Sequence, residues 1–205
     1  MNPAGAHIID DDDAILDSLQ WLFTTRNVPS RTWPGGEDFL SEWQPEWRGC
    51  IVLDIRMNGM SGLECFDVLN DRGCEMPVIF ITGHGDVPMA VAALKKGAFD
   101  FIEKPFNDLD LVDKVERAIA QDAALHRAAV DREAVLARLA SLTMREREVM
   151  ELILDGRFNK VIADSLSISM RTVEVHRSRI FEKMQVRSAV ELAQILTMMK
   201  DRRMR

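Results

Sequence analysis

Short β-rich apolar runs alternate with segments of helical periodicity up to about residue 120, and this alternation is the strongest constraint on the fold. The apolar runs are typical of strands, and the segments between them carry apolar residues at three- and four-residue spacing, as amphipathic helices do. Strands separated by helices form parallel sheets. We therefore predict an α/β fold, a (βα)5 doubly wound parallel sheet, with strands at residues 6–9, 30–33, 50–54, 78–82 and 99–104.

The charge of the chain changes sign near residue 141. Residues 1–141 contain 13 Lys and Arg against 24 Asp and Glu, a net charge of −11, whereas residues 142–205 contain 13 against 9, a net charge of +4. This asymmetry predicts two domains with different partners, of which the second binds a polyanion.

Residues 121–141 lie between the two charge regions and contain neither Gly nor Pro. Their richness in Ala, Leu, Arg and Glu favours a solvated connecting helix over a flexible linker. We therefore predict one domain at residues 1–122, a helical linker at residues 123–140 and a second, all-α domain of four helices at residues 141–205.

The segment MNPAGAHIID lacks the basic and apolar character of a signal peptide, and no apolar stretch is long enough to cross a bilayer. We expect a cytoplasmic protein without a membrane partner. The three cysteines, Cys50, Cys65 and Cys74, form neither an even disulfide set nor a C-x-x-C metal pattern. This favours buried, reduced thiols.

Charged and hydroxyl side chains close most of the predicted strands. The first strand ends at Asp10 and Asp11, the third at Asp54, the fourth at Thr82 and the fifth at Lys104. Because ligands bind at the carboxyl ends of parallel strands, we expect these side chains to converge. Clustered carboxylates are tolerated around a hard divalent cation, which predicts a Mg2+ site. A central carboxylate there can accept a phosphoryl group as nucleophile, with the lysine and threonine holding its oxygens.

Four stretches, IIDDD, VLDIRMNGMSG, VIFITGHGD and FDFIEKPF, resemble in order and spacing the receiver domain of bacterial two-component response regulators, over about residues 5–122. This domain has a flavodoxin-like fold. The resemblance implies that Asp54 is the phospho-acceptor. It also implies that Mg2+ is bound by Asp10, Asp11, Asp54 and the backbone carbonyl of Arg56.

The same resemblance implies a set of switch residues. Thr82 would be the switch hydroxyl, Lys104 the phosphate-binding lysine, and Phe101 the aromatic residue that rotates inward when the threonine moves. The sequence departs from the family at Asn58, where many members have proline after RM. His84, two residues after the threonine, either influences dephosphorylation or is a solvent-facing loop histidine without a role.

The basic half predicts four helices with recognisable caps. Thr143 and Glu146 form a T-x-x-E capping box, and Gly156 suits a helix end. NKVIADSL is a short second helix, SIS is a tight turn, and Ser169 is the N-cap of a third helix. This is the outline of a helix-turn-helix.

The predicted third helix has two faces. Val173, Ile180 and Met184 form an apolar stripe that can pack on the rest of the domain. The other face suits the major groove, because it combines arginines for phosphates with a carboxylate that can accept from cytosine and a valine that can contact a thymine methyl.

This basic segment resembles the LuxR-type helix-turn-helix of the NarL/FixJ response regulators over about residues 138–200. The matching stretches are LTMREREVMELILDG, NKVIADSL, TVEVHRSRIFEKM and VRS. The resemblance implies base-facing positions at Glu174, Val175 and Ser178. It also implies DNA-backbone contacts at Lys160, Arg171, Thr172, His176, Arg177 and Arg179.

Together the two resemblances imply a transcriptional regulator that is activated when a sensor histidine kinase transfers a phosphoryl group to Asp54, with Mg2+ as cofactor. Its expected partners are the kinase, double-stranded promoter DNA, RNA polymerase and, after phosphorylation, a second copy of the chain. We do not expect an enzyme.

Two other hypotheses stay open. The chain could bind DNA constitutively and use its first domain only for assembly. It could also be a phosphohydrolase with Asp54 as turnover nucleophile, although Arg56 stands where dehalogenase-like phosphatases have a second acid.

Overall fold

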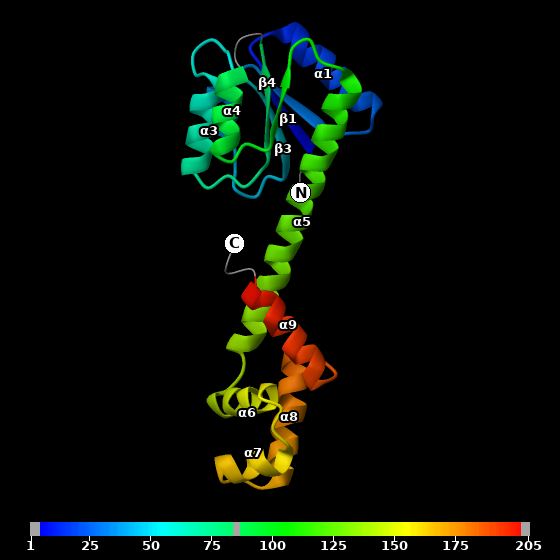
Figure 1. Cartoon of the computed structure of the whole chain (residues 1–205). Coiled ribbons are helices and arrows are strands. Elements are labelled where there is room, and N and C mark those ends of the chain that lie inside the picture. The colour runs from blue at the N-terminus through cyan, green and yellow to red at the C-terminus, as the bar shows by residue number, and fades with distance from the viewer. Residues whose placement is uncertain (1–4, 84–86, 202–205) are drawn as a thin grey trace. The chain divides into compact units, whose positions relative to one another are not determined.

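The structure is a computed structural model that describes residues 5–83 and 87–201. The chain divides into two compact units, an amino-terminal unit of residues 1–126 and a carboxy-terminal unit of residues 127–205 (Figure 1). Among the described helices, none combines the length and apolar character needed for a membrane span.

The amino-terminal unit is built around a parallel sheet with the strand order β2-β1-β3-β4-β5. The register pairs Ile9 with Leu53 and Asp54 with Ile81, so neighbouring strands end at one common edge. This strand order is that of the flavodoxin-like doubly wound fold, which confirms the predicted fold class. The strands are β1 (Gly5–Ile9), β2 (Ser30–Trp33), β3 (Gly49–Asp54), β4 (Val78–Thr82) and β5 (Asp100–Glu103).

Helices cover both faces of the sheet, which explains why the strands are almost continuously apolar (Figure 1). The helices α1 and α5 pack on one face, where Phe23 and Leu111 are fully buried. The other three helices pack on the opposite face, around the buried Phe39 and Phe80. Their bounds are α1 (Asp13–Thr25), α2 (Gly36–Glu42), α3 (Gly62–Asp71), α4 (Val87–Lys95) and α5 (Asp108–Ala140).

Helix α5 is 33 residues long and continues through the predicted connecting segment without a break. Its first turns are buried against the sheet, whereas Leu125 is 55% exposed, as expected of a solvated connecting helix. Asp122 is buried and accepts a hydrogen bond at 2.9 Å from the backbone N–H of Gly49, at the start of β3. The predicted long linker helix is confirmed.

The edge of the sheet at β1 and β2 carries an aromatic cluster of His7, Trp33, Phe39 and Trp47. The His7 ring stacks on Trp47 with the ring centroids 5.0 Å apart and the planes 8° from parallel. Burial, and secondarily the charge of Arg31, lowers the pKa of His7 to about 4. His7 is therefore neutral and part of the core at physiological pH.

The carboxy-terminal unit consists of helices around a core that includes Val149, Ile162 and Val173. Thr143 and Glu146 form the predicted capping box at the start of α6, and Gly156 follows the end of that helix with φ of 73°. The helices here are α6 (Met144–Leu154), α7 (Asn159–Leu166), α8 (Met170–Met184) and α9 (Ala189–Asp201). The predicted four-helix domain is confirmed.

All three cysteines are free thiols, as predicted. Cys50 and Cys65 are buried, whereas Cys74 is half-buried. Burial raises the pKa of the Cys65 thiol to about 12, so it stays protonated and unreactive at neutral pH.

Candidate functional site

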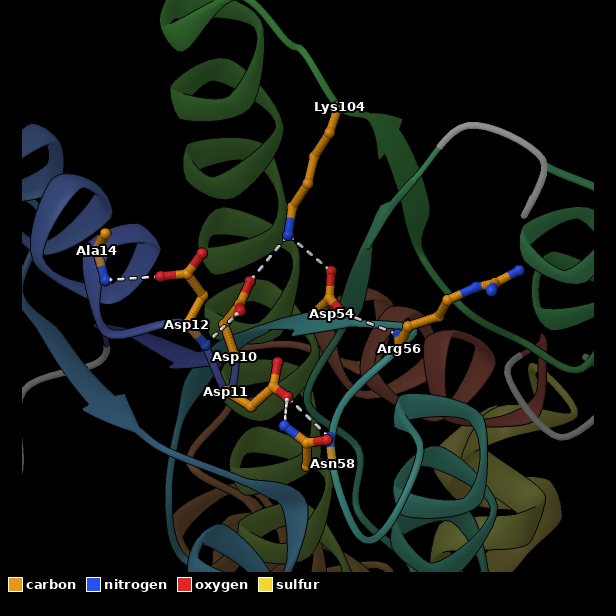
Figure 2. A network of polar contacts seen from close by, with 8 residues as sticks. All are labelled: Asp10, Asp11, Asp12, Ala14, Asp54, Arg56, Asn58 and Lys104. Carbon is orange, nitrogen blue, oxygen red and sulfur yellow. Dashed lines mark hydrogen bonds and ion pairs between the residues drawn. The ribbon is translucent and has the colours of Figure 1, made fainter.

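Asp10, Asp54 and Lys104 meet at the carboxyl edge of the sheet. The Lys104 ammonium donates to Asp10 Oδ2 at 3.0 Å and to Asp54 Oδ1 at 2.8 Å (Figure 2). The three residues follow or end β1, β3 and β5, whose ends the parallel register brings together. The backbone N–H of Arg56 donates to Asp54 Oδ2 at 2.8 Å, so both oxygens of this carboxylate have a donor.

Burial determines the electrostatics of this cluster. Asp10 is 1% exposed and Asp54 6% exposed. Burial raises the pKa of Asp54; the hydrogen bond and charge of Lys104 oppose this rise, and the charge of Asp10 adds to it. Burial alone would lower the pKa of Lys104, but its hydrogen bonds to the two carboxylates outweigh this and raise it. The Lys104 ammonium thus stays charged, and the cluster has two carboxyl groups for one ammonium.

Asp11, the third predicted carboxylate, has different partners. It is exposed, and its Oδ2 accepts from the backbone N–H of Asn58 at 2.8 Å and from the Asn58 side-chain amide at 2.6 Å (Figure 2). These bonds tie the loop after β1 to the loop after β3. The three carboxylates that we expected to converge therefore fall into two groups. Asp10 and Asp54 form a buried pair held by Lys104, whereas Asp11 is exposed and held by Asn58.

Asp12 and Asp13 start helix α1, as their position after the strand suggests. Asp12 is the N-cap, and its side chain accepts from the backbone N–H of Ala14 at 2.9 Å. Asp13 lies in the first turn, where a carboxylate interacts favourably with the helix dipole. Of the four consecutive aspartates, Asp10 therefore belongs to the cluster, Asp11 pairs with Asn58, and the other two start α1.

The oxygen donors at this edge suit Mg2+, a hard cation that prefers carboxylates and carbonyls. The excess negative charge of Asp10 and Asp54 over Lys104 would be compensated by a divalent cation. Within the described part of the chain, no three His, Cys, Asp or Glu side chains form a metal-binding group by themselves. Since Mg2+ commonly takes one or two carboxylates and keeps several waters, the residues present fit this ion.

Of the predicted switch residues, Thr82 lies at the same edge of the sheet as the cluster, and its carbonyl accepts from the backbone N–H of Lys104 at 2.7 Å. Thr82 ends β4, is fully buried, and its hydroxyl donates to the carbonyl of Gly83 at 3.1 Å. Phe101 on β5 is half-buried and packs against the core on the α2–α4 face of the sheet. His84 lies outside the described residues.

The helix-turn-helix consists of α7 and α8, joined by a turn in which Ser167 adopts a left-handed conformation with φ of 53°. Ser169 caps α8 by accepting from the backbone N–H of Thr172 at 3.1 Å. Val173, Ile180 and Met184 are fully buried, which confirms the predicted packing stripe.

The opposite face of α8 is open to solvent. Among the predicted DNA contacts, Arg171, Glu174, Val175, Ser178 and Arg179 are exposed, whereas Thr172, His176 and Arg177 are half-buried. On α7, Lys160 is exposed. The Arg177 guanidinium lies 5.4 Å from the centroid of the Phe181 ring. All of the predicted contacts except Lys160 thus lie on α8, and their role stays a prediction.

Two residues, Asn58 at the site and Asp122 at the opposite edge of the sheet, have partners that the sequence pattern did not indicate. Asn58 was noted only as a departure from proline, and Asp122 was not singled out. The Asn58 amide contacts a carboxylate 47 positions away, and Asp122 contacts a backbone N–H 73 positions away. A polar residue in place of proline, opposite an exposed aspartate, was the one available signal.

Two protein families match the chain. The response regulator receiver domain matches residues 6–116, and the luxR family of bacterial regulatory proteins matches residues 140–196. The first match covers the sheet and its acidic edge, and the second covers the helix-turn-helix.

Full-length relatives match as well. The C4-dicarboxylate transport transcriptional regulatory protein DctR of Rhodobacter capsulatus is 53% identical over 191 residues, or 92% of this chain and 97% of that one. The transcriptional regulatory protein FixJ of Azorhizobium caulinodans is 45% identical over 92% of this chain and 90% of that protein.

Solved structures agree with these relatives. The low-resolution structure of the response regulator StyR has a TM-score of 0.87 at 36% identity, and covers 95% of this chain and 98% of that one. Full-length FixJ from B. japonicum has a TM-score of 0.60 at 38% identity, and covers 96% and 97%.

Proposed function

Since this chain belongs to the NarL/FixJ family of two-component response regulators, with a receiver domain and a LuxR-type DNA-binding domain, we propose that phosphorylation of Asp54 controls its binding to promoter DNA. The phosphoryl donor is the phosphohistidine of a sensor histidine kinase. We propose functional boundaries at residues 1–122 for the receiver, 123–140 for the linker and 141–205 for the DNA-binding domain.

The observation that carries this proposal is the pair of hydrogen bonds from Lys104 to Asp10 and Asp54. They put a nucleophilic carboxylate, a second carboxylate and a cation within hydrogen-bond reach of one another. An aspartate that only capped a strand would not need this ammonium. A phospho-acceptor does, because the transferred group brings negative charge to the same place.

In the transfer step, an Asp54 oxygen forms a bond to phosphorus while the bond between phosphorus and the histidine nitrogen breaks. The electron pair of that bond returns to the imidazole of the kinase, and Asp54 becomes an acyl phosphate. Arg56 N–H holds the other oxygen of the Asp54 carboxylate in place during attack. Lys104 then leaves Asp54 Oδ1 and pairs with a phosphoryl oxygen.

Mg2+, when bound, would neutralise charge on the phosphoryl oxygens. Asp10, Asp11, Asp54 and the backbone carbonyl of Arg56 would hold it. This ligand set is supported by the hard oxygen donors at the edge and by the excess of negative charge that Lys104 leaves uncompensated.

The new charge at Asp54 draws the Thr82 hydroxyl away from the Gly83 carbonyl and towards the phosphoryl group. Phe101 then turns into the space that the threonine leaves, and the surface formed by α4, β5 and α5 changes. The support is that Thr82 is buried and, among the described residues, donates to an uncharged acceptor 3.1 Å away, which it can exchange for a charged one.

Helix α8 would then lie in the major groove of double-stranded promoter DNA. Glu174, Val175 and Ser178 would face bases, and the basic residues of α7 and α8 would contact phosphates. We propose that phosphorylation favours a homodimer, which doubles these contacts, and that RNA polymerase is a further partner of the DNA-bound protein in the cytoplasm.

The test is incorporation of one phosphoryl group from acetyl phosphate with Mg2+, read by intact mass. Wild type and the matched control Asp13→Asn, an exposed aspartate of α1, are expected to gain one phosphoryl group. Asp54→Asn is expected to gain none, and a mutant that still gains it would refute the assignment.

The same samples separate a phosphorylation-dependent regulator from a constitutive one. Genomic fragments captured with and without phosphodonor identify the target DNA, and titration of a captured fragment gives its affinity. A wild-type affinity that is unchanged by phosphorylation, in protein shown to be modified, would support constitutive binding.

A further inference from the structure

We infer that Asn58 is a positioning residue for the magnesium ligand Asp11, an inference that rests on the proposed function. Asn58 donates twice to the same oxygen, Asp11 Oδ2: its backbone N–H at 2.8 Å and its side-chain Nδ2 at 2.6 Å. Both contacts are short enough to be charge-assisted hydrogen bonds to an ionised carboxylate.

This arrangement is specific to the residue at position 58. Proline, which many members have there, carries neither a backbone N–H nor a polar side chain, so it could make neither bond. Alanine could make only the backbone bond. The second donor to Asp11 is therefore a property of asparagine in this chain.

Within the described part of the chain, Asn58 engages only one of the two oxygens of Asp11. Oδ2 is held by Asn58, while Figure 2 shows the other carboxylate oxygen on the side of Asp10 and Asp54. A metal ion taken up there would use this second oxygen without displacing either donor. The two hydrogen bonds can thus persist in the free and in the Mg2+-bound protein.

Because these bonds persist, we can predict whether they raise or lower the affinity for Mg2+. Asp11 is exposed, so without its donors the side chain would sample several rotamers and would lose that freedom on binding a metal. Donors that persist restrict it beforehand, as outer-shell groups do for metal ligands generally. Asn58 is therefore expected to increase the affinity for Mg2+.

The experiment is isothermal titration calorimetry of the full chain with Mg2+ alone, comparing wild type with Asn58→Ala and Asn58→Pro. Loss of outer-shell partners typically weakens metal binding about 10- to 100-fold. Because Asp11 is exposed and the alanine variant keeps the backbone donor, we expect about three- to tenfold weaker binding for Asn58→Ala. Asn58→Pro, which loses both donors, should bind more weakly still.

Asn70→Ala is the matched control, since Asn70 is an exposed asparagine of α3, and it should leave the affinity unchanged. The urea midpoint of each variant tests the fold. The 13C resonance of the Asp11 carboxyl adds a readout of the hydrogen bonds, and it should shift in Asn58→Ala even without metal.

The outcomes separate this role from the site itself. Equal or tighter Mg2+ binding by a folded Asn58→Ala variant would overturn the positioning role and leave the proposed Mg2+ site standing. A wild-type protein that binds no Mg2+ would overturn both.

Discussion

The buried carboxylate of Asp122 on α5 accepts a hydrogen bond at 2.9 Å from the backbone N–H of Gly49 at the start of β3. It joins the last part of α5 that packs on the sheet to a strand 73 positions earlier. Gly49 has φ of 126° and its missing Cβ would lie 1.9 Å from the carbonyl oxygen of Gly5, so only glycine fits here.

Asp122→Ala should lower the free energy of unfolding of the amino-terminal unit by about 1–3 kcal/mol, because it leaves the Gly49 N–H buried without an acceptor. Asp122→Asn retains an acceptor oxygen and should lose less. Urea unfolding followed by tryptophan fluorescence measures this unit alone, since the four tryptophans, at positions 21, 33, 43 and 47, all precede residue 127. Asp113→Ala, an exposed change on the same helix, is the control and should be close to neutral.

His7 should make the amino-terminal unit sensitive to acid. Its pKa is about 4 in the folded protein against 6.5 in the unfolded chain, so the unfolded chain binds the proton first as pH falls. The contribution of the neutral His7 side chain to the free energy of unfolding is therefore complete above pH 6.5. It decreases as pH falls towards 4, and the total loss is about 3 kcal/mol.

His7→Phe should reduce this pH dependence, because the replacement keeps an aromatic ring and cannot titrate. Urea midpoints at several pH values between 4 and 7 measure the difference from wild type, with His126→Gln as an exposed control. A wild-type slope retained in His7→Phe would show that other groups cause the acid sensitivity.

Lys104→Met should destabilise the metal-free protein, because it leaves Asp10 and Asp54 buried without a cation. Breaking a fully buried pair costs about 3–5 kcal/mol, and we expect about 1–3 kcal/mol here because the lysine side chain is 28% exposed. Adding Asp10→Asn to Lys104→Met should recover part of the loss. Urea unfolding in EDTA tests both changes, and additive losses in the double variant would argue against this electrostatic origin.

Glu146→Ala should destabilise the carboxy-terminal unit by about 1–2 kcal/mol, because it removes the reciprocal capping bond to Thr143 and the ion pair with Lys183 at 2.7 Å. The Lys183 hydrogen bond lowers the pKa of Glu146, so this contribution is present above the unfolded pKa of 4.5 and is lost as pH falls below it. Thermal unfolding followed by far-ultraviolet circular dichroism measures the effect. Glu151→Ala, an exposed glutamate of the same helix, should change little.

Arg179→Ala should weaken binding to a captured promoter fragment and to unrelated DNA by similar factors, because an arginine that contacts phosphate carries no sequence information. The slope of log K against log salt should fall by about 0.9, the value for one phosphate contact. Fluorescence anisotropy at several salt concentrations gives both quantities, with Arg132→Ala on the exposed side of α5 as the control. A loss confined to the promoter fragment would make Arg179 a base-reading residue.

Local patterns were sufficient to predict most of the fold. The period of the apolar residues gave the strands and helices, and Thr143, Glu146, Gly156 and Ser169 marked the helix ends, because capping depends on residues three or four positions apart. The strand ends also placed Asp10, Asp54 and Lys104 together, since parallel strands bring their carboxyl ends to one edge.

Contacts that depend on the tertiary path of loops and rings could not be predicted in this way. No periodic pattern links Asp11 to Asn58 or Asp122 to Gly49. His7, which has no partner pattern in the sequence, is buried in an aromatic cluster because alternate residues of β1 face opposite cores. Such side-chain partners follow from packing rather than from spacing.

The Lys104 ammonium between Asp10 and Asp54 also affects the order in which a cation and an anionic phosphodonor can bind at this cluster. Because two carboxylates face one ammonium at this cluster, an anionic phosphodonor would be repelled there unless a divalent cation offset their charge. If Asp54 is phosphorylated as proposed, its reaction with a phosphodonor would therefore depend on the free magnesium concentration.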